Sequence, residues 1–376
     1  MTCYSRRISG IERGYLHIAT RGPHPTIHTV IDFDGTVPAE TWHHASGVAT
    51  AANPGMAVVR RSRRWAHNSH PCPVVFHEWV DDPNDVKEFH DDINLVTGPV
   101  TTVHVFQDED RTRVVLAASH AVTDGRGMER FLVDLLAAVD GREPVGSPDV
   151  ETDVEAARSL GASSRPQPNV TRRDPVRSPL GGKDNHRHWT SRAWPSAPGA
   201  MSARIGAAVA RMIDHPVMVI IPVDLRRHLP HLRSTANLSA QLPLTIQPGQ
   251  PWKSIHGHLL MALARKHDLA MISEDFRQNN PFTTTLVGSQ TDGLDGNFPC
   301  AAIISDHGKL DISRFRTSTL TPVAMHSLPM LVPYSGMFIS SSTVNDATTV
   351  TIAHRLDDDP QIIDTFFDLI NDQMAD

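Results

Sequence analysis

Residues 114–125 read Val-Val-Leu-Ala-Ala-Ser-His-Ala-Val-Thr-Asp-Gly, and this stretch decides the interpretation of the chain. The apolar run 114–119 predicts a buried strand. Residues 127–139 place apolar side chains three and four positions apart, which predicts an amphipathic helix. His120 therefore stands between a strand and a helix, where its side chain is held in place. Because imidazole accepts and returns a proton near neutral pH, the pattern favours a general base.

The three fixed positions of this HxxxDG pattern, His120, Asp124 and Gly125, are weak evidence when taken alone. A core histidine followed by an Asp-Gly turn and a helix would give the same letters. The function therefore depends on whether the rest of the chain agrees with the motif.

Further segments agree with it in order and spacing. They are residues 8–12, 53–60 with Trp65, 93–95, 98–100, 222–226, 237–243 and 304–311. With the motif, they resemble the acyltransferase superfamily that includes chloramphenicol acetyltransferase, the plant alcohol acyltransferases and the condensation domains of nonribosomal peptide synthetases. Three departures stand out. Ser119 replaces the first histidine of many condensation domains, Asp306-His307 replaces a more usual Asn-Leu or Asn-Val, and the DFGWG sequence of the plant enzymes is missing.

The resemblance implies an α/β fold made of α+β two-layer sandwiches. Two chloramphenicol acetyltransferase-like subdomains would form a V-shaped pseudo-dimer with a tunnel at their interface. We expect residues 1–145 to form the N-terminal subdomain with the motif and residues 199–376 the C-terminal one. Residues 146–198 are rich in Pro, Ser, Arg and Gly, which predicts a linker or crossover that is partly disordered. A length of 376 residues also favours two domains.

Periodicity predicts the elements within these parts. Strands are expected at 30–33, 74–79, 101–106, 112–119, 215–223, 301–304, 327–332, 336–341 and 348–354. Helices are expected at 39–50, 127–139, 205–212, 251–274 and 361–374.

The resemblance also assigns roles to the motif residues. His120 would be the catalytic base, in a tunnel entered by the acyl thioester from one side and the nucleophile from the other. Asp124 would point away from the reaction and pair with an arginine, for which Arg226 is the first choice, with Arg314 and Arg316 as rivals. Gly125 would permit close packing or an unusual backbone angle.

Four further residues are candidates for contacts to the substrate or the oxyanion: Ser119, Asn237, Ser305 and His307. For Ser305 and His307, a turn with solvent-exposed polar groups is the more ordinary explanation, and for Asn237 a turn is an equal alternative. No bound cofactor and no metal are expected. Acyl-CoA or a phosphopantetheinyl carrier-protein thioester would be the co-substrate, and a small molecule the acceptor.

Three functions remain open. The first is an acyltransferase or condensation enzyme of specialised metabolite biosynthesis, which makes an ester or an amide. The second is a cyclase of the same fold that acts on a biosynthetic intermediate. The third is a non-catalytic module that docks a carrier or partner protein, against which the intact His120, Asp124 and Gly125 argue.

Composition excludes several other classes. A net charge of −7 gives no support to nucleic-acid binding, and no apolar run is long enough to cross a membrane. Three widely spaced cysteines, Cys3, Cys72 and Cys300, and the lack of a secretory signal favour reduced thiols in the cytoplasm. The 22 histidines show no metal-ligand spacing. The basic run 60–64 is either a solvated loop or a contact for a phosphate or an acidic carrier protein.

Overall fold

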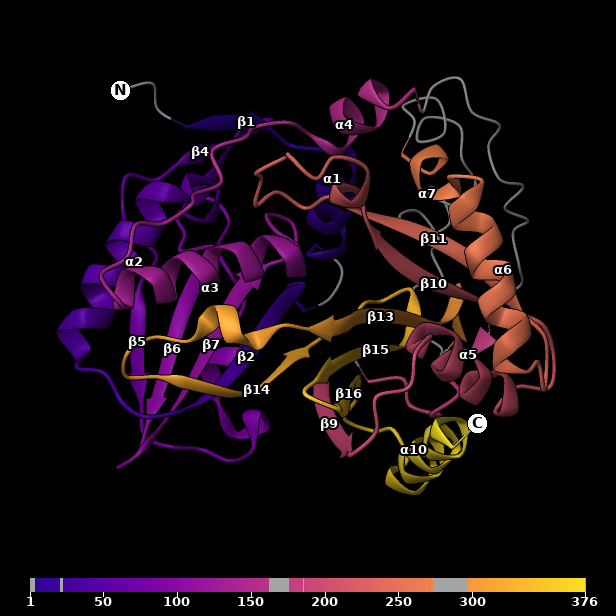
Figure 1. Cartoon of the computed structure of the whole chain (residues 1–376). Helices are drawn as coiled ribbons and strands as arrows, with labels where there is room; N and C mark the ends of the chain where they lie inside the picture. Colours follow the sequence, from indigo (N-terminus) through magenta and orange to yellow (C-terminus); the bar gives the residue numbers. More distant parts are fainter. Residues whose placement is uncertain (1–3, 21–22, 162–175, 185, 273–296, 376) are drawn as a thin grey trace.

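The computed structural model describes residues 4–20, 23–161, 176–184, 186–272 and 297–375. The chain folds into two halves that lie side by side, each built on a β-sheet with helices against it (Figure 1). The predicted fold class, α/β with α+β two-layer sandwiches, is therefore confirmed.

The first half contains a five-stranded sheet with the strand order β14-β2-β7-β6-β5. Helices α2 and α3 pack on one face of it, and their apolar side chains share a core with the sheet. A small sheet, β1-β4-β3, lies beside it. The elements of this half are β1 (Ser5–Arg7), α1 (Gly10–Ile18), β2 (Thr26–Asp34), α2 (Ala39–Ala52), β3 (Val58–Arg61), β4 (Arg64–His67), β5 (Val74–His77), β6 (Thr101–Gln107), β7 (Arg111–Ser119), α3 (Gly125–Val139) and β14 (Thr321–Leu328).

The second half contains a six-stranded sheet with the order β11-β10-β13-β15-β16-β9. Helices α5, α6 and α10 pack against this sheet, and their apolar side chains form one core with it. The elements are α4 (Asp153–Ser159), β8 (Val176–Arg177), β9 (Arg187–Trp194), α5 (Met201–Arg211), β10 (Val217–Asp224), β11 (Ser239–Ile246), α6 (Trp252–Ala264), α7 (His267–Ala270), β12 (Asn297–Phe298), β13 (Cys300–Leu310), β15 (Ser335–Val344), β16 (Ala347–Arg355) and α10 (Pro360–Met374).

A third apolar core joins the two halves and explains why the central strands are apolar on both faces. In β10, Val219 packs with the helices, whereas Ile220 packs in the core between the halves. In β7, Leu116 packs in the core of the first half, whereas Val115 packs in the core between the halves. Successive side chains of a strand point to opposite faces, so a strand that is buried on both reads as a continuous apolar run.

Strand β14 crosses from the second half into the first. It pairs antiparallel with β2, from Thr321 opposite Asp34 to Leu328 opposite His28. The range 199–376 therefore contributes a strand to the N-terminal sheet, where it covers an edge of β2 that would otherwise be unpaired. The predicted strand 327–332 was wrong beyond Leu328, because Pro329 has no N–H group with which to continue the ladder.

The predicted linker 146–198 contains ordered elements. Helix α4 begins with a capping box between Thr152 and Glu155. Strand β9 pairs with β16 along its whole length, so the second sheet takes a strand from before residue 199. Residues 162–175 of this range lie outside the described residues.

The predicted helix 251–274 is two helices. Lys266 has a φ of 55°, in the left-handed region, and separates α6 from α7. Residues 273–274 lie outside the described residues. The other predicted strands and helices each overlap an observed element of the same type.

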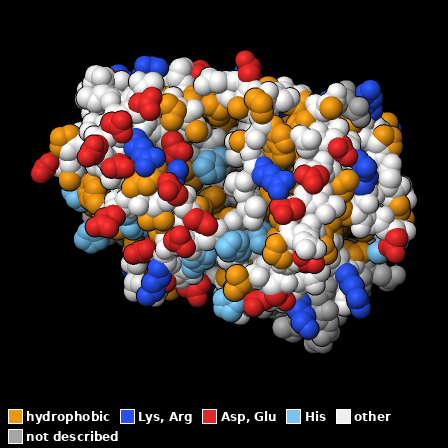
Figure 2. Space-filling model, turned by 90° about the horizontal axis from the view of Figure 1, so that it is seen from below, with side chains coloured by type: hydrophobic (Ala, Val, Ile, Leu, Met, Phe, Trp, Pro, Cys, Tyr) orange, Lys and Arg blue, Asp and Glu red, His pale blue; other side chains and the backbone are white. Residues whose placement is uncertain are grey.

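The surface agrees with the balanced composition. On the face shown in Figure 2, Lys and Arg side chains are intermixed with Asp and Glu, and histidines lie near its middle.

Cys72 and Cys300 are buried free thiols, and burial raises the pKa of each to about 12. Cys3 lies outside the described residues. None of the described helices has the length and apolar character needed to cross a bilayer.

Candidate active site

The HxxxDG segment is the connection between β7 and α3. Strand β7 ends at Ser119, and the amide of His120 still donates to the carbonyl of Pro25, at 2.8 Å. Asp124 caps α3, since its Oδ1 accepts from the amide of Gly127 at 2.8 Å. The loop between the two elements is therefore fixed at both ends, and His120 is fixed with it.

The ring of His120 has a defined tautomer. Its Nδ1 lies 2.8 Å from the carbonyl oxygen of Thr123, so Nδ1 carries the proton and donates it. The amide Nδ2 of Asn237, also near Nδ1, donates instead to the carbonyl oxygen of His120 at 2.7 Å. Nε2 is left with its lone pair and takes part in no hydrogen bond within the described part of the chain.

A cavity of about 70 Å³ adjoins His120 between the two halves. Gly125 and Met128 line it from the first half, and Ser305 and His307 from the second. Pockets for small molecules usually measure about 300–1000 Å³. The interface position agrees with the expected tunnel, but the cavity has room for only a few atoms. Entry of a molecule of ordinary ligand size would therefore require the surrounding side chains or the two halves to separate.

Burial lowers the pKa of His120 below its usual value. The hydrogen bond to Thr123 and the charge of Asp124 oppose this effect without cancelling it. The imidazole is therefore neutral at pH 7, which is the form that accepts a proton.

Asp124 points away from His120 toward Arg226, whose Nη1 lies 3.0 Å from Oδ2. The same oxygen accepts from the amide of Leu238 at 2.7 Å. Burial would raise the pKa of Asp124, but Arg226 and these hydrogen bonds bring it below its usual value. The rival arginines lie elsewhere, because Arg314 pairs with Glu129 and Arg316 donates to Thr321.

Arg226 connects the motif loop to the second half. Besides Asp124, its guanidinium reaches the carboxylate of Asp224 at 2.8 Å and the backbone carbonyls of Ser234 and Ala236. All its donor nitrogens are thus bonded, in the fork geometry that arginine provides.

Two predicted contact residues do not line the cavity. The hydroxyl of Ser119 lies 2.8 Å from Nε2 of His24. Asn237 holds the backbone of His120 through its Nδ2, while its Oδ1 accepts from the amide of Ser239 at 3.2 Å. Both side chains position the histidine loop rather than face the space where a substrate would react.

Gly125 and His307 meet at the cavity wall. A Cβ atom on Gly125 would lie 2.9 Å from Cε1 of His307, so only glycine allows this approach. Nε2 of His307 lies 3.4 Å from the hydroxyl of Ser327, and burial lowers the pKa of His307. Ser305 and His307 therefore line the cavity beside His120, and their contact with a substrate or an oxyanion stays a prediction.

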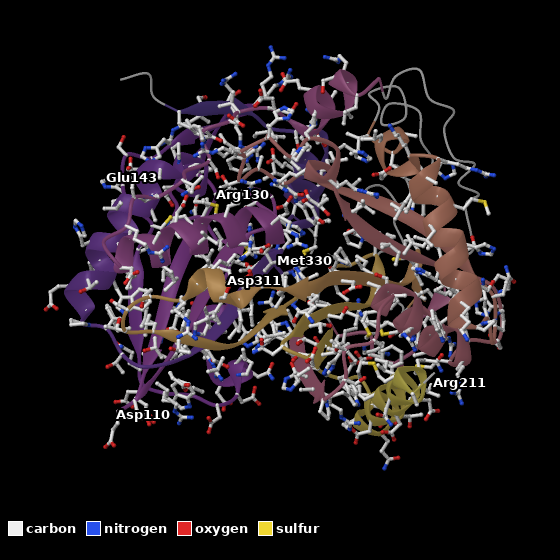
Figure 3. The ribbon with its side chains drawn as sticks, viewed as in Figure 1. Asp110, Arg130, Glu143, Arg211, Asp311 and Met330 are labelled. Carbon is white, nitrogen blue, oxygen red and sulfur yellow. The ribbon has the colours of Figure 1, made fainter. Side chains whose placement is uncertain are left out.

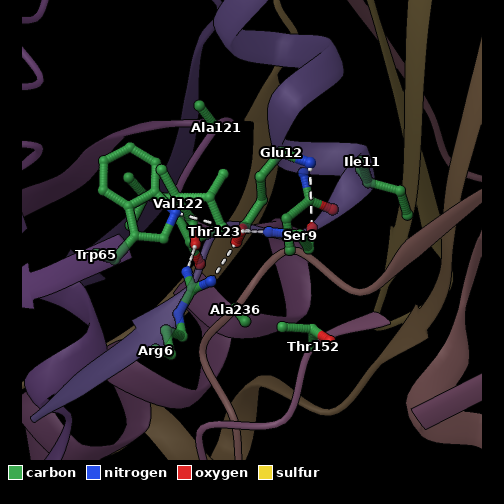
Figure 4. Close-up of polar contacts among 12 residues, drawn as sticks. Arg6, Ser9, Ile11, Glu12, Trp65, Ala121, Val122, Thr123, Thr152 and Ala236 are labelled. Atoms are coloured by element: carbon green, nitrogen blue, oxygen red, sulfur yellow. Dashed lines mark hydrogen bonds and ion pairs between the residues drawn. The ribbon is translucent and has the colours of Figure 1, made fainter. Parts of the chain in front are cut away.

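The N-terminal segment also belongs to the site, which sequence reasoning missed. The ring of Tyr15 lies against that of His120, with 4.4 Å between centroids and an angle of 31° between the ring planes. Arg6, 1 % exposed, donates to the carbonyl oxygen of Val122 at 2.7 Å and pairs with Glu12 at 2.6 Å (Figure 4). The Ser-x-x-Glu capping box formed by Ser9 and Glu12 was the one available signal.

Gly127 is a second residue that sequence reasoning missed. A Cβ there would lie 2.4 Å from Oγ1 of Thr123 and 2.5 Å from the backbone oxygen of Thr235.

We expect Gly127→Ala to lower the free energy of unfolding by about 1–3 kcal/mol, because a backbone oxygen must move. The control Gly47→Ala, on α2 with nothing near its Cβ, should raise stability by about 0.5–1 kcal/mol. Urea unfolding of both variants tests this, and equal effects would contradict it.

Two other sequence features lie outside the site. Residues 60–64 form the exposed β3–β4 hairpin, where Arg61 donates to the carbonyl of Val96 and Arg64 to Ser5. This geometry is that of a solvated loop. Within the described ranges, no group of three or more His, Cys, Asp or Glu side chains is arranged to hold a metal ion.

Comparison with solved structures identifies the fold. The first condensation domain of the calcium-dependent antibiotic synthetase, solved with a substrate analogue, gives a TM-score of 0.70 at 16% identity, over 99% of this chain and 97% of that one. A variant of the starter condensation domain of rhizomide synthetase, solved with C8-CoA, gives 0.68 at 12% identity over 99% and 95%. The chain has the condensation-domain fold.

The chain is also similar to a cyclization-docking bidomain from Sorangium cellulosum, with a TM-score of 0.66 and 12% identity over 98% of this chain and 84% of that one. No protein-family model matches the sequence, and a search of curated proteins finds no match. The resemblance drawn from the motif and its companion segments is confirmed at the level of this fold. Because one fold serves several reactions, the activity has to be argued from the site.

Proposed function

We propose that this chain is an acyltransferase that moves an acyl group from a CoA or carrier-protein thioester to a hydroxyl or amine acceptor, in specialised metabolite biosynthesis. The observation that carries the proposal is the free Nε2 of His120 beside a cavity between the halves of a condensation-domain fold. The starter condensation domain solved with C8-CoA supports a thioester of this class as the donor.

His120 would act as the base and then as the acid. As the acceptor O–H or N–H attacks the thioester carbonyl carbon, its proton passes to Nε2 and a C–O or C–N bond forms. The tetrahedral intermediate then collapses, the C–S bond breaks, and the thiolate takes the proton from Nε2. The imidazole ends neutral, so it needs no acyl-enzyme and no external reagent. Holding both reactants beside one base lowers the entropic part of the barrier.

A thioester panel tests the proposal. Incubation of the chain with acyl-CoA and acyl-carrier donors, plus hydroxyl and amine acceptors, should release one free thiol for each ester or amide formed. Because the pKa of His120 is lowered, kcat/KM should fall with acidification at a lower pH than an imidazole of ordinary pKa would require, as the ring becomes protonated. A rate that rises as pH falls below 6.5, or no thiol release with any donor, would count against the proposal.

A cyclase is the second candidate, favoured by the similarity to the cyclization-docking bidomain. Ring closure within one bound intermediate loses water or leaves the mass unchanged, and it need not release CoA or a carrier thiol. Intact mass of the product, measured beside the thiol count, separates the two reactions. Recovery of a partner protein by the chain, with no turnover of any thioester, would point to the docking module.

A further inference from the structure

A groove of about 610 Å³ lies beside the site, between α3, the turn Leu225–His228 and the turn Ile312–Phe315. It is nearly nine times the volume of the cavity at His120 and falls within the range of small-molecule sites. The charged side chains that line it are five arginines and three carboxylates, namely Arg126, Arg130, Arg226, Arg227, Arg314, Glu129, Asp134 and Asp224.

The carboxylates that line the groove form ion pairs with three of its five arginines, Arg126, Arg226 and Arg314. Arg126 and Arg314 both contact the single carboxylate of Glu129. The carboxylate of Asp134 accepts hydrogen bonds from the backbone amides of Val145 and Gly146 and from the side chain of Asn53. It forms no ion pair with an arginine of the groove among the described residues. Asp224 is bound to Arg226, which already holds Asp124.

The other two arginines, Arg130 and Arg227, form no ion pair with a carboxylate of the groove lining. Arg130, which projects from α3 near the middle of the molecule (Figure 3), donates to the carbonyl of Leu232 at 3.2 Å, and no carboxylate of the described residues lies within ion-pair distance of it. Arg227 lies 3.9 Å from a carboxylate oxygen of Asp268 that His228 already contacts at 2.7 Å.

The arginines repel one another. Burial lowers the pKa of Arg130 and the neighbouring Arg226 lowers it further, whereas the carboxylates of Asp224 and Asp124 act against this effect without cancelling it. Burial and Arg126 act in the same way on Arg314. Among the arginines of the groove, Arg130 is thus the one with no carboxylate of the described residues within ion-pair distance, and an anion bound in the groove would provide a partner for it.

The groove and the cavity at His120 share a wall. Gly125 lines the cavity and the next residue, Arg126, lines the groove. Nη2 of Arg126 donates to the carbonyl oxygen of His307, whose side chain also lines the cavity, at 3.1 Å. The groove therefore lies next to the reaction cavity, on the other side of residues 125–126.

We propose that this groove binds the phosphate groups of the thioester co-substrate, an inference that rests on the proposed function. Guanidinium groups match phosphate oxygens in pairs, and several that converge favour a phosphate over a single carboxylate. The phosphate has two sources, the nucleotide of CoA and the phosphopantetheine arm of a carrier protein. Their shared chemistry is a pantetheine chain that ends in a phosphate.

Binding measurements test the groove directly. The titrants are CoA, 4′-phosphopantetheine and pantetheine, and the proteins are the natural chain, the double variant Arg130→Gln/Arg227→Gln and the control Arg211→Gln. Arg211, labelled in Figure 3, pairs with Asp372 on α10, away from the groove. The double variant should bind CoA and phosphopantetheine roughly tenfold or more weakly, with pantetheine unaffected. The control should bind all three as the natural chain does.

The comparison of titrants identifies the source. CoA that binds much more tightly than phosphopantetheine indicates the nucleotide, whereas equal affinities indicate the carrier-borne arm. Unchanged affinity for both phosphates in the double variant, while thioester turnover persists, overturns the groove and leaves the proposed function standing. Phosphate affinity that depends on Arg130 and Arg227, without turnover of any thioester, supports the groove while the proposed function fails.

Discussion

Replacement of Arg226 by alanine is expected to lower the free energy of unfolding by about 3–5 kcal/mol. The side chain is 5 % exposed and bonds to Asp124, Asp224 and two backbone carbonyls. Without it, Asp124 keeps a buried negative charge with no cation beside it, and the carbonyls of Ser234 and Ala236 lose their donor. Leaving a buried charge unpaired costs more than losing an exposed ion pair.

Urea unfolding measures this effect. Arg226→Lys should be intermediate, because an ammonium keeps the charge but loses the fork that reaches two carbonyls. The control is Arg211→Ala, which removes an arginine from the half-exposed pair with Asp372 and should cost about 0–1 kcal/mol. If Arg226→Ala cost no more than Arg211→Ala, the ion pair would not hold the motif loop to the second half.

The individual strands and helices were predictable because each depends on the spacing of apolar residues within a short stretch of sequence. The apolar run before His120 and the helical spacing after it correspond to β7 and α3. The order of the companion segments led to the fold and to the choice of Arg226 over Arg314 and Arg316. That choice came from the resemblance, since no spacing rule links Arg226 to Asp124, which stands 102 residues earlier.

The long-range pairings were not predictable from periodicity. Strand β14 has the composition of any half-buried strand, and nothing local shows that it joins the sheet of the first half. The same holds for β9, whose polar letters read as a linker until β16 is placed beside it. A partner far away in sequence, rather than local propensity, decides both.

The direction in which a side chain points was the second property that the sequence could not predict. Ser119 and Asn237 are polar residues near His120, and a sequence cannot tell whether such a group faces a substrate or the backbone. The structure turns Ser119 toward His24 and Asn237 toward the main chain of His120. Arg6 and Tyr15 were missed for the opposite reason, since more than a hundred residues separate them from the loop that they contact.

The second large effect is expected at His120. His120 lines the cavity and its Nδ1 is bonded to Thr123, which leaves Nε2 as the proposed base, so His120→Ala should lower kcat by about 10²–10⁴-fold. The companion variant His120→Asn retains an amide donor for the carbonyl of Thr123 but has no base, and it should lose as much activity as the alanine variant. Because neither change leaves a buried charge, the melting temperature of both should stay close to that of the natural chain.

The measurement that tests the account most directly is single-turnover acyl transfer by His120→Ala and His120→Asn, with the exposed His215→Ala as the matched control. We predict thiol release and product formation at the natural rate for His215→Ala and loss of both for the two His120 variants, with all three proteins folded. A folded His120→Ala protein that still transfers the acyl group at the natural rate would contradict the assignment of His120 as the base.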